Sequence, residues 1–164
     1  MAITLDGTNG IDLNGTELIL DVDADTSITA DTDDTLHFKI AGSDHIQFTA
    51  SGITVTDSTS SEPRILLLNT NADNNPALLD FQKDSASPAD NDIMMILRNI
   101  GDNDAGETIA YVTLVGTSSD VSDGAEDGRL AFNTYVDGTN AERMCIAANG
   151  FVGIGTTLPS KSID

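Results

Sequence analysis

The feature that most limits the fold of this chain is the regular placement of turn-forming residues between short apolar runs. Short β-type runs follow one another at intervals of about 8–12 residues, separated by Gly, Asn and Asp. No segment keeps the apolar spacing of an amphipathic helix beyond two turns. Dipeptides that favour turns with positive φ lie between many of the runs: Asp6-Gly7, Asn9-Gly10, Asn14-Gly15, Asp123-Gly124, Asp127-Gly128, Asp137-Gly138 and Asn149-Gly150. The sequence therefore predicts an all-β protein.

Strands are expected where β-branched, aromatic and leucine residues gather. These runs are Glu17–Leu20, Thr35–Ala41, His45–Thr49, Ile53–Val55, Arg64–Leu68, Leu78–Phe81, Ile93–Leu97, Thr108–Val115, Arg129–Val136, Arg143–Ala147 and Phe151–Ile154. In Thr35–Ile40 apolar residues alternate with polar ones, so one face of that strand is apolar. The run Asp92–Arg98 also fits a capped helical turn, but its neighbours and the β-branched Ile96 favour a strand.

Three parts are expected along the chain. Residues 1–56 contain short strand-like runs separated by polar turns and are rich in Asp and Thr. This pattern indicates an N-terminal segment of short β-repeats that serves for attachment. Residues 57–63 have the composition of a linker. Residues 64–164 carry longer runs and form the main β-rich domain. Near the N-terminus, alternating apolar residues could dock on a partner by adding a strand to its sheet: Ile3, Leu5, Ile11 and Leu13.

The composition leaves little to bury inside a single chain. Apolar residues make up 39% of the 164 residues, aromatic residues only 4%, and Trp is absent. A compact monomer of this length would normally carry more large side chains. Two explanations remain, disorder or a core completed by other copies of the chain. Because strand-like runs continue along the whole sequence, we favour the second.

The charge excludes several classes of partner. The chain has 27 acidic and 7 basic residues, a net charge of −20. Such a surface repels nucleic acid and anionic lipid. The sequence has no apolar run of transmembrane length and does not start with a secretory signal. We therefore expect no nucleic-acid binding and no membrane insertion. The single cysteine, Cys145, excludes an intrachain disulfide and suits synthesis in a reducing cytoplasm.

A hairpin is predicted around Asn149-Gly150. A two-residue turn there would place Ile146 opposite Gly153 and Met144 opposite Gly155. Large residues that face glycines leave space on that face of the hairpin. Either a second chain fills this space around a threefold axis, or the glycines only form a bend or bulge. Met144, Ile146, Gly153 and Gly155 are thus the candidates for packing at a trimer axis.

Alternating carboxylates at Asp21, Asp23 and Asp25 resemble the opening of a calcium-binding loop. Counted from Asp21, however, Thr26 stands where that loop needs Gly, and Thr32 stands where it needs Glu. We therefore expect acidic turns rather than a metal site.

Catalytic machinery is not expected either. His37 and His45 are interpreted as polar strand residues, and Cys145 lies in no recognisable nucleophile motif. The spacing of Gly150, Gly153 and Gly155 does not match a dinucleotide-binding motif. The chain is also short for a polysaccharide depolymerase and poor in the aromatic residues that stack on sugars. The sequence predicts a protein that is no enzyme and has no cofactor.

Several spaced segments resemble tail-fibre and spike-like structural proteins of tailed bacteriophages. The resemblance is carried by residues 17–29, 38–42, 84–92, 101–106, 123–132, 142–146 and 149–160, the last with the signature Val-Gly-Ile-Gly-Thr-Thr. It implies a parallel homotrimer, built as an intertwined β-fibre or β-prism or as a short sandwich-like module. In long fibres this signature usually precedes a C-terminal chaperone region, which is not part of this chain. The chain would then be either the mature product after cleavage or a naturally short member.

The resemblance implies a structural role in the virion, assembled in the cytoplasm of the bacterial host. The first expectation is a trimeric fibre or spike component that projects from the particle and contacts the host. One alternative is a trimeric capsid decoration (cement) protein or head fibre, in contact with other capsid or tail proteins. A second alternative is a carbohydrate-binding receptor protein for host surface glycans. For that role Tyr111, Phe132 and Tyr135 would have to lie exposed near carboxylates.

Overall fold

The computed structural model describes residues 4–6, 10–12, 17–32 and 34–162. These residues form no helix, strands make up 48% of the structure, and the all-β prediction is confirmed. None of them therefore lies in a helix that could cross a membrane. The chain divides into two compact units, Met1–Ala77 and Leu78–Asp164. This division falls later in the chain than the linker expected at residues 57–63.

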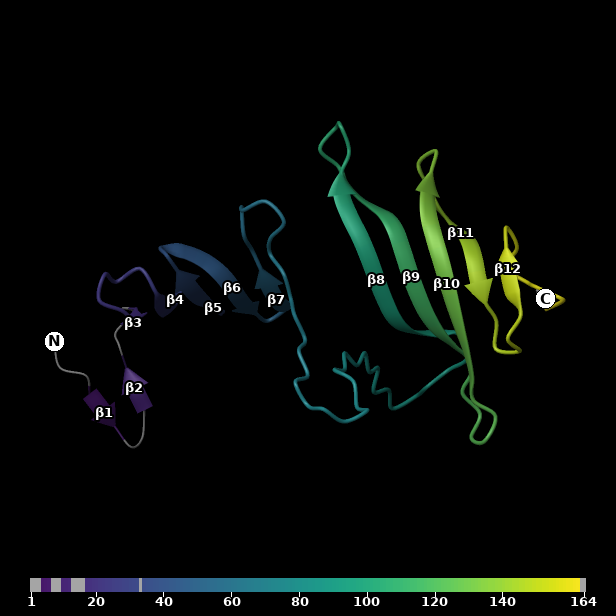
Figure 1. The fold of residues 1–164 in the computed structure, drawn as a ribbon, viewed down its shortest axis with the longest axis horizontal. Coiled ribbons are helices and arrows are strands. Elements are labelled where there is room, and N and C mark those ends of the chain that lie inside the picture. Colours follow the sequence, from purple (N-terminus) through teal and green to yellow (C-terminus); the bar gives the residue numbers. More distant parts are fainter. Residues whose placement is uncertain (1–3, 7–9, 13–16, 33, 163–164) are drawn as a thin grey trace. The chain divides into compact units, whose positions relative to one another are not determined.

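The first unit contains a small hairpin and a five-stranded sheet (Figure 1). The hairpin pairs β1 (Thr4–Asp6) with β2 (Gly10–Asp12). The sheet consists of β3 (Leu18–Ile19), β4 (Ser27–Thr32), β5 (Thr35–Ile40), β6 (Ser43–Thr49) and β7 (Gly52–Val55). Each strand pairs antiparallel with the next one along the chain, so the sheet is a meander.

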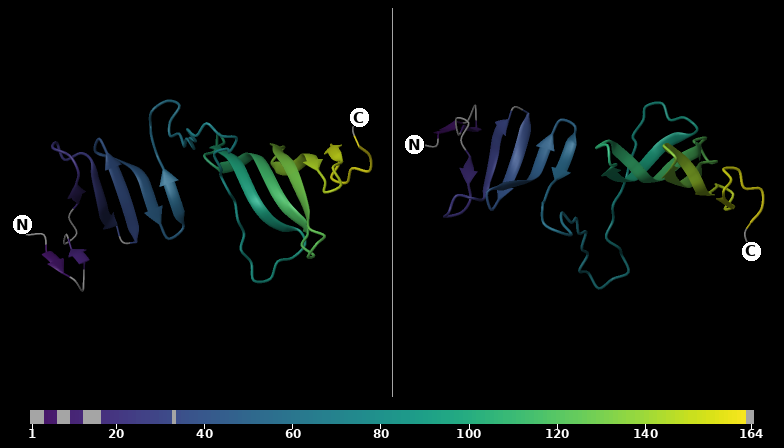
Figure 2. Two further views of the ribbon diagram at one scale, coloured as in Figure 1. Left: turned by 60° about the horizontal axis from the view of Figure 1, so that its bottom comes forward. Right: turned by 90° about the horizontal axis from the view of Figure 1, so that it is seen from above.

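The second unit is another five-stranded antiparallel meander. It consists of β8 (Asp92–Asp102), β9 (Thr108–Asp120), β10 (Asp127–Val136), β11 (Thr139–Ile146) and β12 (Val152–Ile154). Figure 2 shows how strongly this sheet twists, and β8 and β12 form its two edges. The run Asp92–Arg98 is thus a strand, as predicted.

The sheet of the first unit separates apolar from polar side chains. Residues paired across an antiparallel ladder share a face, and neighbours along a strand alternate between faces. The apolar face carries Leu18, Ile28, Leu36, Phe38, Ile46, Phe48, Ile53 and Val55. The other face carries Ser27, Thr29, His37, Gln47 and Thr54. The alternation expected for Thr35–Ile40 is therefore confirmed.

Within the described residues each sheet is a single layer, and the closely packed strand pairs are all neighbours in one sheet. Among the described residues, Ala131 and Cys145 are the only hydrophobic side chains classed as buried. The chain exposes 12527 Å² of surface. Two compact units that shared its mass of 17.1 kDa would expose about 9,300 Å². A single chain therefore forms sheets but closes no core.

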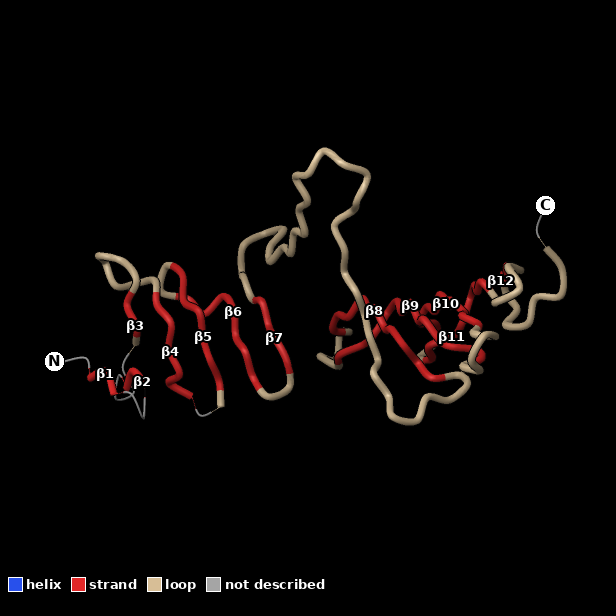
Figure 3. The backbone as a smooth tube through the Cα atoms, turned by 90° about the horizontal axis from the view of Figure 1, so that it is seen from below, coloured by secondary structure: helices blue, strands red, loops and turns tan. Residues whose placement is uncertain are grey.

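Two predicted strands are wrong for the single chain. The runs Arg64–Leu68 and Leu78–Phe81 lie in the long irregular segment between β7 and β8, which is tan in Figure 3. A strand exists only where its backbone pairs with another strand, and neither run finds such a partner within the described chain. The opposite error occurs at β4, which the predicted runs omit because Ile28 is its only large apolar residue.

The predicted register of the last hairpin is also wrong. The structure pairs Met144 with Ile154, Cys145 with Gly153 and Ile146 with Val152. The connection has three residues between Ala147 and Phe151, because the N–H of Ala147 bonds the carbonyl of Phe151 at 2.9 Å. Gly150, at φ 81°, supplies the left-handed residue that such a loop requires. The third loop residue shifts the pairing of β12 with β11 by one residue. Val152 and Ile154, rather than Gly153 and Gly155, therefore share a face with Ile146 and Met144.

We predict that Gly153→Ala destabilises the second unit. A Cβ at this position would lie 2.4 Å from the carbonyl oxygen of Thr156 and 3.0 Å from the Cys145 Sγ. The backbone must shift to relieve this overlap, at a cost of about 1–3 kcal/mol. Urea unfolding at fixed protein concentration measures the effect. Gly101→Ala is the control, because its Cβ would meet the Tyr111 ring at 3.6 Å, an ordinary contact. Equal stability of the two variants would contradict the prediction.

Candidate functional site: the open apolar face of the second sheet

The candidate functional site is one face of the β8–β12 sheet, here called the apolar face. It is defined by two rows of residues that the register places side by side. The first row is Leu97, Leu114, Phe132, Met144 and Ile154, and the second is Met95, Gly116, Leu130, Ile146 and Val152. Each row crosses all five strands, so the apolar surface is continuous from one edge of the sheet to the other.

Within the described part of the second unit, this face is left open. Leu97, Phe132, Ile146 and Ile154 are all exposed. Single exposed apolar residues are ordinary on a protein surface, but a continuous apolar sheet face is typical of an interaction site. The face is therefore suited to bind another apolar surface.

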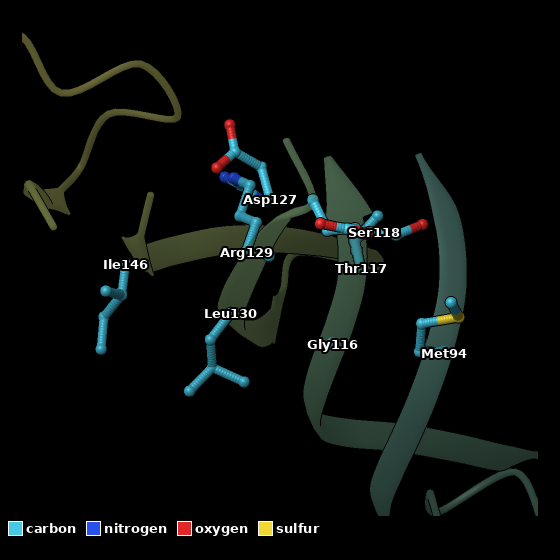
Figure 4. Close-up of a pocket in the computed structure, with 10 residues that line it drawn as sticks. Met94, Gly116, Thr117, Ser118, Asp127, Arg129, Leu130 and Ile146 are labelled. Carbon is cyan, nitrogen blue, oxygen red and sulfur yellow. The ribbon is translucent and has the colours of Figure 1, made fainter. Parts of the chain in front are cut away.

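An open trough of about 650 Å³ runs along part of this region (Figure 4). Leu130 and Ile146 point in the same direction at the trough, whereas Arg129 and Asp127 point the other way. Gly116, between Met95 and Leu130 in the row, contributes no side chain there. Met94, Thr117, Ser118, Glu126 and Gly128 complete the lining. The trough is thus an open hollow with both apolar and polar residues in its lining.

The opposite face is covered in part by the chain itself. Its central row is Ile96, Val115, Ala131, Cys145 and Gly153. Residues after β12 fold over this row, and Cys145 is 0% exposed, with its Sγ 3.6 Å from the carbonyl oxygen of Thr156. The covered side of the sheet thus contrasts with the open apolar face.

An ion pair lies on this covered side. The guanidinium of Arg129 pairs with the carboxylate of Glu142 and also reaches the carbonyl oxygen of Thr157 at 3.5 Å. The hydrogen bond that Arg129 donates to the Glu142 carboxylate raises the pKa of Arg129 above its usual value. Arg129 therefore connects β10, β11 and the segment after β12.

The four candidates for axis packing do not share one face. Met144 and Ile146 lie on the apolar face, and Gly153 lies on the opposite one. Gly155 follows β12, and its N–H bonds the carbonyl of Arg143 at 2.8 Å. The space expected opposite the glycines is occupied at Gly153 by Thr156 of the same chain. Packing of Met144 and Ile146 at a threefold axis stays a prediction.

The N-terminal docking candidates are only partly described. Ile3 and Leu13 lie outside the described residues. Leu5 and Ile11 are register partners across β1 and β2. Docking on another protein through this segment stays a prediction.

The structure brings the three predicted carboxylates together. Asp21, Asp23 and Asp25 each place one oxygen within 4.8 Å of the others. Burial raises the pKa of Asp25, and the charges of Asp23 and Asp21 raise it further. Hydrogen bonds from Thr26 lower the pKa of Asp21. Of the candidate groups, this cluster is the one with geometry for a cation, although the interpretation as acidic turns is unchanged.

The aromatic candidates for sugar stacking do not converge. Tyr111 and Tyr135 contact each other edge to face, with ring centroids 6.4 Å apart. Phe132 lies on the opposite, apolar face of the sheet. The three rings therefore form no common platform.

The two histidines lie in the first unit and Cys145 lies in the second. His37 Nδ1 is 3.6 Å from a carboxylate oxygen of Asp44, and His45 Nδ1 is 3.1 Å from one of Asp57. Each histidine is thus near a carboxylate of its own unit.

Reasoning from the sequence did not identify the apolar face of the second sheet as one surface. Its signal is the alternation within β8, β10 and β11, but that alternation assigns faces only once the cross-strand register is known.

A scan of the chain against protein-family models finds no match, and a search of curated proteins finds no similar sequence.

We predict that Asp23→Asn lowers the pKa of Asp25, because it removes a negative charge that opposes ionisation of the Asp25 carboxyl. A raised pKa in the folded chain means that ionisation of Asp25 opposes folding as the pH rises through that pKa. The variant should weaken this opposition. NMR titration of the side-chain carboxyl carbons measures the pKa directly, with Asp57→Asn as the control. An unchanged pKa of Asp25 in Asp23→Asn would show that the charge of Asp23 does not act on Asp25.

Proposed function

We propose that this chain is a non-enzymatic structural protein of a bacteriophage virion, a homotrimeric fibre or spike component that projects from the particle. Its role is mechanical: it holds an extended, protease-resistant shape and presents a surface to the host. The proposal also assigns the chain to the virion and names copies of itself and other virion proteins as its partners.

The open apolar face carries this proposal. A sheet that covers only part of one face with its own chain and leaves the other face apolar and open is incomplete as a monomer. The surplus surface is about 3,000 Å² relative to two compact units. Obligate interfaces bury about 2,000–5,000 Å², which is the same order as this surplus, although part of the surplus belongs to the irregular segment between β7 and β8.

The composition and the resemblance favour copies of the same chain as the cover. Packing three sheets around one axis buries apolar faces that no single chain can bury, and it needs few large aromatic residues. The segments similar to phage fibre proteins, including the signature at residues 152–157, support the same arrangement. The net charge of −20 works against close approach at random orientations and so favours association through the apolar faces alone.

We predict a mass of three chains and an elongated profile for the purified protein. Light scattering gives the mass, and small-angle X-ray scattering gives the shape. A squat trimer would favour the decoration role on a capsid over the fibre role. A stable monomer at micromolar concentration would contradict the proposal, because the apolar face would then remain open in solution.

We predict that Phe132→Asp weakens the assembly at least about ten-fold, because it places a charge in the middle of the apolar face. Tyr111→Asp is the matched control, since Tyr111 is 40% exposed and Phe132 is 37% exposed. Tyr111 contacts Tyr135 on the opposite face, so its replacement should leave association unchanged. Sedimentation velocity across a dilution series measures both. Equal weakening by the two variants would argue against the apolar face as the interface.

A further inference from the structure

Two apolar runs have no backbone partner among the described residues. Residues 64–68 and 78–81 form no backbone–backbone hydrogen bond with a described residue. Every large apolar side chain in them is exposed; in the second run Leu78, Leu79 and Phe81 are 69%, 66% and 45% exposed. A segment with unpaired backbone N–H and C=O groups and exposed apolar side chains is suited to pair as a strand with the edge of a sheet.

The two runs flank a turn that is already formed. The side-chain amide of Asn69 donates to the carbonyl of Asn75 at 2.9 Å, which closes the turn. Asp73 accepts the N–H of Asn75 at 3.0 Å, and this bond lowers the pKa of Asp73. The segment therefore has local order although its apolar side chains are uncovered.

The second sheet offers the edge that such a run needs. β8 pairs with β9 on one side, and its other side is an edge of the sheet (Figure 1). This edge strand is 11 residues long and exposes Ile93, Ile96, Leu97 and Ile100. Proteins normally cover or charge a long apolar edge, because it would otherwise pair at random with other chains.

The second run matches the two faces at this edge. As an added strand, the run Leu78–Gln82 would place Leu79 and Phe81 on one face and Leu78, Asp80 and Gln82 on the other. In β8, Leu97 lies on the apolar face and Arg98 on the opposite face. If Asp80 lies beside Arg98, Leu79 and Phe81 extend the apolar face, whichever way the strand runs.

Charge also fits this placement. Arg98 is one of only seven basic residues of the chain, and it makes no ion pair with a described residue. Asp80 likewise forms no ion pair or hydrogen bond in the part of the chain that the structure describes. Opposite charges on directly facing strand residues stabilise the pair. An Asp80–Arg98 pair would fix the register of the added strand.

We propose that the run Leu78–Gln82 of one copy adds as a strand to the β8 edge of a second copy, with Asp80 beside Arg98. A second copy is favoured because the chain does not place this run on its own edge. Residues 90–92 are bound to the end of β9: Asn91 N–H donates to the Ser118 carbonyl at 2.6 Å, and the Asp90 carboxylate accepts the Val121 N–H at 3.0 Å. Lys83 pairs with Asp92 at 2.6 Å, which anchors the end of the run near the start of β8.

This inference rests on the proposed self-association and names the segment and the edge through which it occurs. Every copy carries one donor run and one acceptor edge. Such a head-to-tail contact closes into a ring when each copy is rotated by the same angle. Three copies would form a closed trimer in which no β8 edge remains free.

Disulfide trapping tests the inference. In the double variant Asp80→Cys with Arg98→Cys, facing strand residues would have Cα atoms about 4.5–5.5 Å apart, within reach of a disulfide. We expect oxidation to link the chains covalently into dimers and trimers on a non-reducing denaturing gel. Asp84→Cys with Arg98→Cys is the control, because Asp84 lies beyond the run, and we expect little linkage. Cys145 is buried, and the two single-cysteine variants check that it does not react.

The outcomes separate this inference from the proposed function. A disulfide within one chain, seen as a monomer band of altered mobility, would overturn exchange between copies. If light scattering finds a trimer but no disulfide forms, the inference is overturned, whereas the proposed trimer is not. A monomer would overturn both.

A charge exchange gives a second readout that does not depend on cysteines. Asp80→Arg or Arg98→Asp alone should weaken association up to about five-fold. The two changes together should restore it, whereas a further loss in the double variant would count against the pairing. Far-UV circular dichroism checks that each variant keeps its sheets.

Discussion

Backbone hydrogen bonding between neighbouring strands is the interaction on which each unit of this protein depends. In most globular domains burial of apolar side chains dominates stability. Here a chain on its own buries almost no large hydrophobic side chain, and its sheets are held by their ladders, by cross-strand pairs such as Phe38–Phe48 and by local polar contacts. Sheets without a buried apolar core are expected to have a small free energy of unfolding. Completion of the apolar faces by further copies would therefore contribute most of the folding free energy, and folding and assembly would be thermodynamically inseparable.

The acidic residues have a structural part in this arrangement besides their effect on net charge. Asp57, Asp73 and Asp120 each accept the backbone N–H of the residue two positions later. These turns lower the pKa of all three carboxyls, because hydrogen bonds favour the ionised form. Abundant Asp thus organises the connections between strands. The same residues leave the exposed turns negative, so the proposed association of copies would use the apolar sheet faces rather than the turns.

Much of the secondary structure could be predicted, and the reasons for the failures are physical. Alternation in Thr35–Ile40 and the β-rich surroundings of Asp92–Arg98 identified β5 and β8 correctly, because both signals are local. The register around Asn149-Gly150 was missed by one residue, since a two-residue and a three-residue loop look alike in sequence. The runs Arg64–Leu68 and Leu78–Phe81 have strand-like sequences but no partner in one chain. Sequence pattern reports that a segment suits a sheet, and it does not report which chain supplies the neighbouring strand.

The meander order of both sheets bears on how the protein matures. Every strand pairs with the one that precedes or follows it, so all contacts between strands are local in sequence. Low contact order favours rapid folding, so strands can start to pair while a chain is still being synthesised, before other copies stabilise the sheets. The slow step of maturation would then be the association of chains whose apolar sheet faces and unpaired strand edges are already exposed. Yield would depend on a competition between productive encounter and aggregation, which makes expression level and temperature during synthesis as influential as any single side chain.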